Sequence, residues 1–341
     1  MKNLKISYSA YELKFKKPFV TSKSEISKKK GFLIKISDSS FSGMGECAPF
    51  PEFGSETIER ADEKLKDLNI KLNLNPNNFK ENLQNSFKKL ENFPSLKHGI
   101  EQALLNLICN KTNISLNVLL NVSSNSEILV NAVVGFLPPA ESVKVCSDLL
   151  KEGFKTIKIK VGRDKFEDDI KVIKKIRDKL GNDFKIRIDA NGKWNLKNAI
   201  LILNSLEKYN IEYVEQPVNS IQGFIKLKKE TKIPLAADES IRTLADAEKF
   251  IDKKAADILI IKPMMLGGLL PTLKIIELCK KNKMDVVITS SFESSLGRSF
   301  AIFAASTLKN KNAHGLGTAK YFIKDIFPDP YPIKNGKIIL K

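Results

Sequence analysis

The 341-residue chain carries 57 lysine and arginine residues against 39 aspartate and glutamate residues, a net charge of +18, and 42% of its residues are hydrophobic. No apolar run is long enough to span a bilayer and the N-terminus lacks the apolar stretch of a signal peptide, so we expect a cytoplasmic protein with no membrane partner. Lysines are spread along the whole chain and arginine is scarce, which disfavours nucleic-acid binding. The net positive charge is compatible with an anionic substrate.

The first third of the chain reads as a small α+β unit. Residues 4–15 and 31–37 form strand-like runs, separated by the polar segment 17–30 and followed by a Gly-rich stretch. Helical patterns follow at 56–68 and 95–112, the second with an apolar stripe at i, i+3 and i+4. Strands followed by helices predict an α+β domain over residues 1–125.

From about residue 126 the pattern becomes a repeat of short apolar strand, turn and amphipathic helix. This alternation predicts a parallel sheet, and eight strands would close it into a (β/α)7β barrel over residues 126–319. An open doubly wound sheet is the alternative, but no glycine fingerprint follows the first strand. The tail, 320–341, lacks the repeat and is expected to pack back onto the N-terminal domain. The strand-like segments are 128–135, 156–162, 185–192, 211–218, 234–240, 257–263, 285–291 and, more weakly, 314–318.

Charged residues close five consecutive strands of this repeat. Lys160, Asp189, Glu215, Asp238 and Lys262 follow one another at intervals of 29, 26, 23 and 24 residues, about one βα unit each. The C-terminal ends of barrel strands form the mouth of the active site. Because a buried charge is costly unless it is paired or bound to a metal, these side chains are expected to converge on one pocket.

The three carboxylates on adjacent strands predict a metal site. Asp189, Glu215 and Asp238 would repel one another unless a cation lay among them. All-oxygen ligation selects a hard ion, and three carboxylates with water and substrate oxygens suit octahedral Mg²⁺. The alternative is that each acid caps the following helix or forms a salt bridge on the rim.

Lysines flank the predicted metal site. Lys158 and Lys160 lie on the same face of one strand. A neighbouring ammonium lowers the pKa of a lysine, which makes Lys160 a candidate general base. Lys262 closes the sixth strand, on the opposite side of the barrel. A lysine-rich chain places lysines by chance, but these three lie in otherwise apolar strands.

Together the motifs KIKVG, RIDANG, VEQP, ADES and IKPMMLGG resemble the enolase superfamily, and the KxK pair resembles its muconate-lactonizing-enzyme subgroup. GECAPFPEFGSET and HGIEQALLNL are similar to the capping domain of that family, and PIKNGKI to its C-terminal ending. The resemblance implies a modified TIM barrel whose α+β capping domain is completed by the C-terminal tail. It also implies a substrate carboxylate bound by Mg²⁺, with Mn²⁺ as a substitute, and a metal-stabilised enediolate.

The same resemblance assigns roles residue by residue. Asp189, Glu215 and Asp238 are the implied metal ligands, and Lys160 is the implied base. Lys158 supports Lys160 by lowering its pKa and by contacting the carboxylate. Lys262 is either a second acid/base or an electrostatic partner of the intermediate.

Further substrate contacts and a lid are expected around this set. Asn191 is a candidate substrate contact, whereas Glu239 is expected to face away from the metal. The segments Phe19–Lys23 and Gly45–Gly54 are expected to close over the pocket. Within the second segment, Phe50 and Phe53 either shield the substrate or pack in the core.

The last two strands bear on the reaction. ITSSFESSLG resembles the seventh strand of the o-succinylbenzoate synthases, where Ser290 and Ser291 leave room for a succinyl carboxylate. Dipeptide epimerases of the subgroup carry an Asp-x-Asp pair after strand eight, but HGLGTAKYF contains no acid. The expected activity is therefore that of a lyase in menaquinone biosynthesis, which dehydrates 2-succinyl-6-hydroxy-2,4-cyclohexadiene-1-carboxylate to o-succinylbenzoate.

Other readings stay open at this point. An N-acylamino-acid racemase, or an epimerase of unusual dipeptides, would use Lys160 and Lys262 as opposed bases. A basic protein that binds nucleic acid or a membrane surface and has no activity is disfavoured, because all three carboxylates of the predicted metal site are present. A homo-oligomer is compatible with the sequence.

The remaining reactive residue types carry no expected chemistry. His98 and His314 lie outside the set of charged strand ends, and His98 is expected to pack in a helix. Four cysteines, with no CxxC pair, are expected to be reduced core residues, which are Cys47, Cys109, Cys146 and Cys279.

Overall fold

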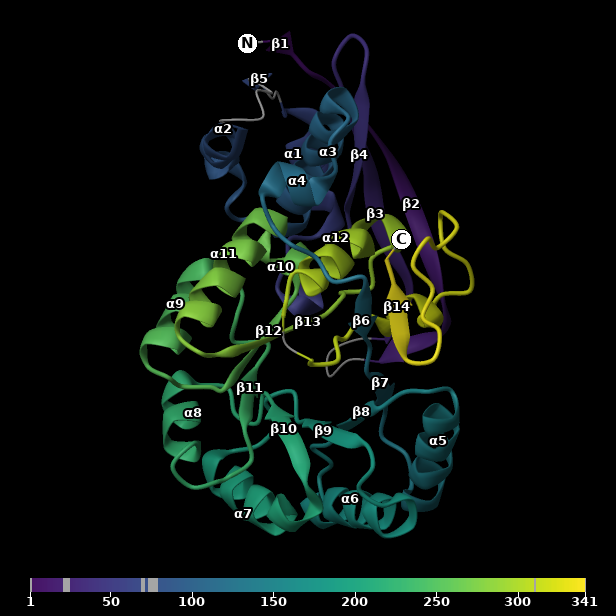
Figure 1. Ribbon diagram of the computed structural model, residues 1–341, viewed down its shortest axis with the longest axis vertical. Coiled ribbons are helices and arrows are strands. Elements are labelled where there is room, and N and C mark those ends of the chain that lie inside the picture. Colours follow the sequence, from purple (N-terminus) through teal and green to yellow (C-terminus); the bar gives the residue numbers. More distant parts are fainter. Residues whose placement is uncertain (1, 21–24, 69–70, 73–78, 310, 341) are drawn as a thin grey trace.

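The computed structural model describes residues 2–20, 25–68, 71–72, 79–309 and 311–340. Its N-terminal part contains a three-stranded antiparallel sheet in the order β2-β3-β4, at one end of the molecule (Figure 1). The strands are β2 (Lys5–Val20), β3 (Glu25–Ser37) and β4 (Ser42–Cys47).

The β2–β3 hairpin is longer than the hydrophobic pattern indicates. Its pairing continues through the polar segment to Val20↔Glu25, with a register shift between Lys14 and Phe19. A backbone ladder does not need apolar side chains, so the hairpin continues through Lys28, Lys29 and Lys30, of which Lys28 and Lys30 are exposed. Within the expected closing segment Phe19–Lys23, Phe19 and Val20 are strand residues, and the rest lies outside the described residues.

Helices cover this sheet, and the two expected ones are confirmed. The long helix α3 (Pro94–Thr112) packs directly against β4, and most of its side chains are buried. A Cβ on Gly45 would clash with the backbone oxygen of Gly99, so only glycine permits this approach. The other elements here are β1 (Lys2–Asn3), η1 (Pro51–Phe53), α1 (Ile58–Lys66), β5 (Lys71–Leu72), α2 (Phe79–Phe87), η2 (Lys88–Leu90) and α4 (Leu116–Leu120).

The second part of the chain is a curled sheet of seven parallel strands in the order β7 to β13, as the repeat predicts. Its strands are β7 (Ala132–Val134), β8 (Thr156–Lys160), β9 (Lys185–Asp189), β10 (Ile211–Glu215), β11 (Leu235–Ala237), β12 (Ile258–Ile261) and β13 (Asp285–Ile288). The helices between and after them are α5 (Pro139–Lys151), α6 (Phe166–Leu180), α7 (Leu196–Leu206), η3 (Glu207–Tyr209), α8 (Ile221–Leu227), α9 (Leu244–Asp252), α10 (Pro263–Leu266), α11 (Leu269–Lys281) and α12 (Ser295–Ser306). Most of these helices lie on the outside of the sheet, whereas α10 and α12 lie toward the N-terminal part and contact α3 (Figure 1).

The expected eighth strand is reduced to two residues that close the barrel. His314 forms a parallel bridge with Val130, and Gly315 forms one with Thr289. Arg187 on β9 is buried inside the barrel and donates to the backbone oxygen of Ala313 at 2.6 Å. The closing segment is therefore held by backbone bridges on both sides and by a cation from within.

The tail divides between the two parts of the molecule. Phe322, just after η4 (Gly317–Tyr321), forms a bridge with Phe15 of β2, as expected for a segment that returns to the N-terminal part. Its end, however, forms β14 (Lys337–Ile339), which pairs antiparallel with β6 (Glu127–Leu129) beside the barrel (Figure 1). The proposed domain boundaries at 125/126 and 319/320 stay a prediction.

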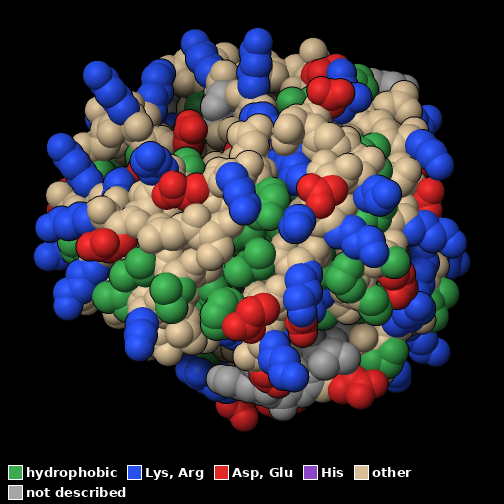
Figure 2. Space-filling view, turned by 90° about the horizontal axis from the view of Figure 1, so that it is seen from below, with side chains coloured by type: hydrophobic (Ala, Val, Ile, Leu, Met, Phe, Trp, Pro, Cys, Tyr) green, Lys and Arg blue, Asp and Glu red, His purple; other side chains and the backbone are tan. Residues whose placement is uncertain are grey.

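The surface agrees with the dispersed charge pattern. On the face in Figure 2, lysine and arginine side chains are distributed among acidic and apolar ones instead of gathering in one patch. Within the described ranges, no helix is both long enough and apolar enough to cross a membrane. All four cysteines are free thiols, and three of them are buried.

Candidate active site

Three of the charged strand ends lie side by side at the mouth of the barrel. In the β8–β9–β10 ladder, Lys160 pairs with Asp189 and Asp189 pairs with Glu215. The carboxylates of Asp189 and Glu215 are almost completely buried, and Asp238 at the end of β11 is 6% exposed. Short parallel strands of matched length therefore bring residues far apart in sequence to one edge of the sheet.

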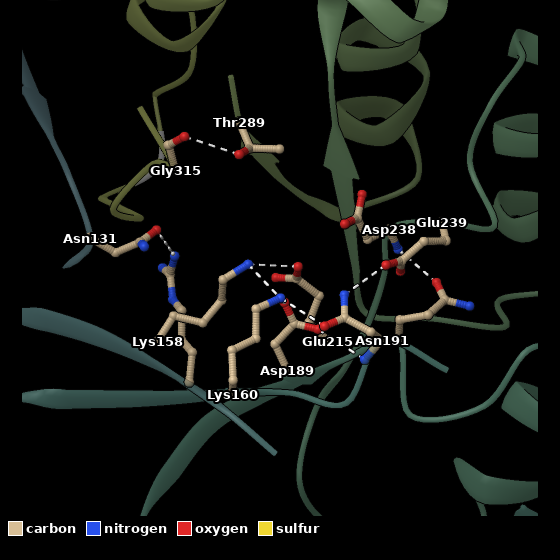
Figure 3. A network of polar contacts seen from close by, with 12 residues as sticks. Asn131, Lys158, Lys160, Asp189, Asn191, Glu215, Asp238, Glu239, Thr289 and Gly315 are labelled. Carbon is tan, nitrogen blue, oxygen red and sulfur yellow. Dashed lines mark hydrogen bonds and ion pairs between the residues drawn. The ribbon is translucent and has the colours of Figure 1, made fainter. Parts of the chain in front are cut away.

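The two lysines of β8 reach these carboxylates directly. Figure 3 shows Lys158 and Lys160 extending side by side toward Asp189 and Glu215. The Nζ atom of Lys158 lies 2.7 Å from Oε1 of Glu215 and 3.1 Å from Oδ2 of Asp189. The Nζ atom of Lys160 lies 2.6 Å from the same Oδ2. Both ammonium groups thus share one carboxylate.

Lys262 forms a second ion pair across the barrel. It follows β12, four strands from β8 in the sheet order. Its Nζ atom lies 2.6 Å from Oδ2 of Asp238, and 4.8 Å from the ring centroid of Phe53. The expected placement of Lys160 and Lys262 on different sides of the mouth follows from this topology.

The charges in this pocket shift one another's pKa values. Burial and the nearby carboxylate of Asp189 raise the pKa of Glu215. Burial also works against ionisation of Asp189, but the ammonium groups of Lys160 and Lys158 outweigh it and hold that pKa well below its usual range. For Lys158, burial lowers the pKa, whereas Glu215 and Asp189 raise it further than burial lowers it. The expected influence of Lys158 on Lys160 stays a prediction.

The donor set fits a hard divalent cation in its chemistry. In the described part of the chain, no three His, Cys, Asp or Glu side chains form a ready-made metal cluster. Instead, lysine ammonium groups form ion pairs with all three acids, and burial together with the neighbouring Asp189 carboxylate raises the pKa of Glu215. Carboxylate oxygens are the ligands that Mg²⁺ prefers. Asp189, Glu215 and Asp238 are therefore the side chains that could hold such an ion.

Asn191 orients the candidate base. Its Oδ1 accepts from Nζ of Lys160 at 2.7 Å, and its Nδ2 donates to Oε1 of Glu239 at 2.8 Å. The Asn191 backbone is left-handed, with φ 46°, which turns the side chain back toward the strand ends. Glu239 thus contacts the site through Asn191 (Figure 3), and its expected orientation away from the metal stays a prediction.

Gln216 is a residue of the site that the sequence did not single out. Its Oε1 accepts from the backbone N–H of Asp238 at 2.9 Å, and its Nε2 donates to Oγ of Ser240 at 2.7 Å. Its own φ is +40°. Gln216 therefore fixes the end of β11, and with it Asp238, against β10. Its place directly after Glu215, within VEQP, was the available signal.

The two serines after β13 differ in their surroundings. The hydroxyl of Ser290 contacts the backbone oxygen of Gly315 at 3.1 Å and Oγ1 of Thr318 at 2.8 Å. The buried hydroxyl of Ser291 has no hydrogen-bond partner among the described residues. Ser290 is thus engaged in closing the barrel, and the expected substrate contact of Ser291 stays a prediction.

Aromatic side chains from the N-terminal part cover this side of the mouth. Phe50 is almost fully buried, and its ring centroid lies 4.5 Å from that of Phe53. Phe53 is partly exposed and lies against Lys262. Phe50 therefore packs in the core, whereas Phe53 contacts the pocket at Lys262.

The two histidines are buried, as His98 was expected to be. Burial lowers the pKa of His98 to about 4 and that of His314 to about 3. The Nδ1 atom of His314 accepts from the backbone N–H of Ile288 at 3.0 Å. Both rings are therefore uncharged packing elements near neutral pH.

The arrangement described above matches a known family. Residues 141–341 match the family described as "Enolase C-terminal domain-like", and residues 1–107 match the one described as "MenC, N-terminal domain". The first match covers more than half of the chain. The chain belongs to the enolase superfamily, and it is an enzyme of that superfamily.

Relatives within the superfamily differ in reaction. The chain is 33% identical to the o-succinylbenzoate synthase of Thermobifida fusca (strain YX) over 204 residues, which are 59% of this chain and 62%, less than two thirds, of that enzyme. It is 27% identical to the N-succinyl-L-Arg/Lys racemase of Bacillus cereus (strain ATCC 14579), over 96% of this chain and 90% of that one. A crystal structure of the dipeptide epimerase from Enterococcus faecalis V583, complexed with Mg and the dipeptide L-Leu-L-Tyr, is 26% identical, with a TM-score of 0.90, and the match covers 100% of this chain and 98% of that one.

Proposed function

We propose that this protein is a Mg²⁺-dependent hydro-lyase that converts 2-succinyl-6-hydroxy-2,4-cyclohexadiene-1-carboxylate to o-succinylbenzoate and water, a step of menaquinone biosynthesis. The observation that carries the proposal is the charge of the segment after the barrel closes. Residues 315–322 contain no acid and one base, Lys320. A substrate ammonium would find no counter-charge there, whereas a second carboxylate on the substrate is compatible with it.

Lys160 is the proposed base in this reaction. In its neutral form it takes the proton from the ring carbon that bears the carboxylate, and it then returns that proton to the departing hydroxyl on the same face of the ring. Asn191, which accepts a hydrogen bond from Nζ, sets the direction of the Lys160 side chain. Aromatisation of the ring drives the second step, so positioning and electrostatics are the main contributions of the protein.

The other charged residues stabilise negative charge at the substrate carboxylate. A Mg²⁺ ion held by Asp189, Glu215 and Asp238 would supply Lewis-acid stabilisation of that charge. Lys158 carries an ammonium held between Glu215 and Asp189, at the same edge of the pocket. Lys262 stays protonated on the other side, paired with Asp238 and in contact with the Phe53 ring.

A second candidate is an N-acylamino-acid racemase. The observation that favours it is the position of Lys160 and Lys262 four strands apart, since racemisation needs a base on each face of the substrate carbon. An N-succinyl amino acid is also an acylated, anionic substrate without an ammonium at the reacting carbon. The free amino terminus of a dipeptide lacks a counter-charge in residues 315–322, which disfavours a dipeptide epimerase.

The experiment compares kcat/KM of the purified protein, with Mg²⁺, for the cyclohexadiene carboxylate and for N-succinyl amino acids. We expect a kcat/KM for dehydration that lies in the usual enzymatic range, about 10⁴ M⁻¹s⁻¹ or more, and at least about a hundredfold above the kcat/KM for racemisation. Racemisation without dehydration would replace the first candidate with the second.

A further inference from the structure

A buried glutamate outside the pocket joins the N-terminal sheet to the barrel. Glu46, in β4, is fully buried. Its Oε1 accepts from the hydroxyl of Tyr11 and from the backbone N–H of Ser294, the latter at 2.8 Å. Its Oε2 accepts from the hydroxyl of Ser294 and from the backbone N–H of Gly297, the latter at 2.8 Å. Both oxygens thus have two donors each.

The donors on the barrel side are the N-terminus of α12. Ser294 is the N-cap of that helix, and Gly297 lies in its first turn. A carboxylate near the first turn satisfies N–H groups that have no partner within the helix and interacts favourably with the helix dipole. Here that carboxylate is supplied by the N-terminal sheet, 248 residues away in sequence from Ser294.

A strained turn precedes this helix and leads to the pocket. Residues 289–294, which we call the strand-seven turn, connect β13 to α12 and contain both predicted substrate serines. Within it, Phe292 has φ 63°, a left-handed conformation that a bulky residue rarely adopts. The turn is held at its start by Ser290, bonded to Gly315, and at its end by Ser294, bonded to Glu46.

Aromatic contacts connect the strand-seven turn to Lys262, on the other side of the pocket from Lys160. The ring centroid of Phe292 lies 6.2 Å from that of Phe53, which in turn lies 4.8 Å from Nζ of Lys262. A turn held in one conformation therefore fixes both the Ser291 hydroxyl and the wall beside Lys262.

We propose that Glu46 is a positioning residue: its carboxylate holds the strand-seven turn in its strained conformation and thereby sets the part of the pocket that recognises the substrate's acyl arm. The positioning role concerns this chain's own contacts, whereas the assignment of the arm as a succinyl group rests on the proposed function. Loss of the carboxylate is expected to weaken substrate recognition more than proton transfer by Lys160, since Lys160 lies on β8 and has separate partners.

The chain offers a matched control in Glu56. It is also buried, and its carboxylate also caps a helix, accepting from the backbone N–H groups of Ser95 at 3.2 Å and Leu96 at 2.7 Å. That helix is α3, within the N-terminal part, and these bonds do not reach the strand-seven turn. Glu56→Gln therefore perturbs a buried cap without touching the turn.

The test measures amide hydrogen exchange and steady-state kinetics for Glu46→Gln, Ser294→Ala and Glu56→Gln. Glutamine at position 46 places an amide N–H against a backbone N–H whichever way it is turned, because both oxygens accept from the backbone. We expect exchange in residues 290–297 to accelerate at least about tenfold in Glu46→Gln and less in Ser294→Ala. We expect KM to rise about tenfold in Glu46→Gln, with kcat within about threefold of the wild-type value. This pattern indicates the loss of an interaction that binds the substrate and the transition state equally. Neither quantity should change in Glu56→Gln.

Two outcomes would overturn the proposal. One is unchanged exchange in residues 290–297 in both Glu46→Gln and Ser294→Ala. The other is faster exchange with KM unchanged for both the cyclohexadiene carboxylate and N-succinyl amino acids, which would leave Glu46 a purely structural cap. Exchange needs no substrate, so absence of dehydration in the wild type would remove the proposed function while the exchange data still decide whether Glu46 holds the turn.

Discussion

Lys160 and Asp189 are direct neighbours across the β8–β9 ladder, and Nζ of the lysine lies 2.6 Å from Oδ2 of the aspartate. The candidate base therefore lies against a candidate metal ligand. A cation that takes this carboxylate competes with the Lys160 ammonium for it, so metal binding is expected to change the contacts of Lys160.

The carboxylate trio predicts stabilisation by Mg²⁺. At a free concentration one hundred times the dissociation constant, Mg²⁺ should raise the free energy of unfolding by about 2.7 kcal/mol, because it binds the folded state alone. Asp238→Asn should abolish most of this gain. Thermal unfolding with and without Mg²⁺ measures it, and Glu277→Gln, at a surface ion pair, is the control. Equal Mg²⁺ effects in the two variants would remove Asp238 from the site.

The two candidate reactions separate at Lys262. Arginine keeps the positive charge but is not a base at working pH. Lys262→Arg should therefore retain part of the dehydration activity, losing about tenfold to a hundredfold from the altered contact with Asp238. Racemisation of an N-succinyl amino acid by the same variant should fall by about 10³-fold or more, because one of two bases is gone. Chiral analysis of product beside the dehydration assay makes the comparison. Retained racemisation would contradict the two-base scheme.

Glu101 predicts an unusual pH dependence of stability. Its buried carboxyl accepts from the backbone N–H groups of Leu269 and Leu270 at the start of α11, and burial raises its pKa to about 7. Between pH 4.5 and 7 the folded state keeps a proton that the unfolded state releases. This contribution to stability is therefore complete below about pH 4.5 and is lost as pH rises toward 7.

The variant Glu101→Gln isolates that contribution, because a glutamine oxygen can still accept both bonds. Relative to wild type, the variant should gain about 3 kcal/mol in free energy of unfolding between pH 4.5 and pH 7.5, from 1.4 kcal/mol per pKa unit. Urea unfolding at several pH values measures the difference. A pH-independent difference would contradict the burial of an ionisable Glu101.

Because β4 and α3 pack closely, we expect alanine substitutions at two glycines, Gly45 and Gly135, to differ in their effect on stability. A Cβ at Gly45 would meet the backbone of α3, whereas one at Gly135 would meet nothing within 4 Å. Gly45→Ala should therefore cost about 3 kcal/mol by forcing the strand and helix apart. Gly135→Ala should change stability by less than about 1 kcal/mol. Chemical unfolding of the two variants tests this, and equal stabilities would contradict the direct strand–helix contact.

The parallel strands could be predicted from the sequence because each has its own apolar run and turn. The same local pattern placed Lys160, Asp189, Glu215, Asp238 and Lys262 at strand ends, and strand ends share one edge of the sheet. The β2–β3 extension was missed because the segment 17–30 is mostly polar and lacks the alternating apolar pattern of a strand, although its backbone pairing continues to Val20↔Glu25. The closing segment was overestimated as a strand because His314 and Gly315 alone form its bridges.

Side-chain partners across long sequence distances were the harder part. No local pattern links Glu46 to Ser294, because this contact depends on how the N-terminal sheet packs on the barrel. None links Arg187 to Ala313, because that contact depends on how the barrel closes. The ion pairs of Lys158 are a further example: the sequence shows Lys158 beside Lys160, but only the fold places Glu215 and Asp189 at 2.7 and 3.1 Å from its Nζ atom. The interactions of a buried charged group depend on its nearest partners in space, which the sequence does not show.

The most direct test of the central claim is turnover of 2-succinyl-6-hydroxy-2,4-cyclohexadiene-1-carboxylate by wild type and by Lys160→Ala, each with Mg²⁺ and with chelator. We predict Mg²⁺-dependent formation of o-succinylbenzoate by the wild type and a loss of at least about 10³-fold in kcat for Lys160→Ala, whose metal-dependent thermal stabilisation should persist. Wild-type activity that survives both the chelator and the loss of Lys160 would contradict the account.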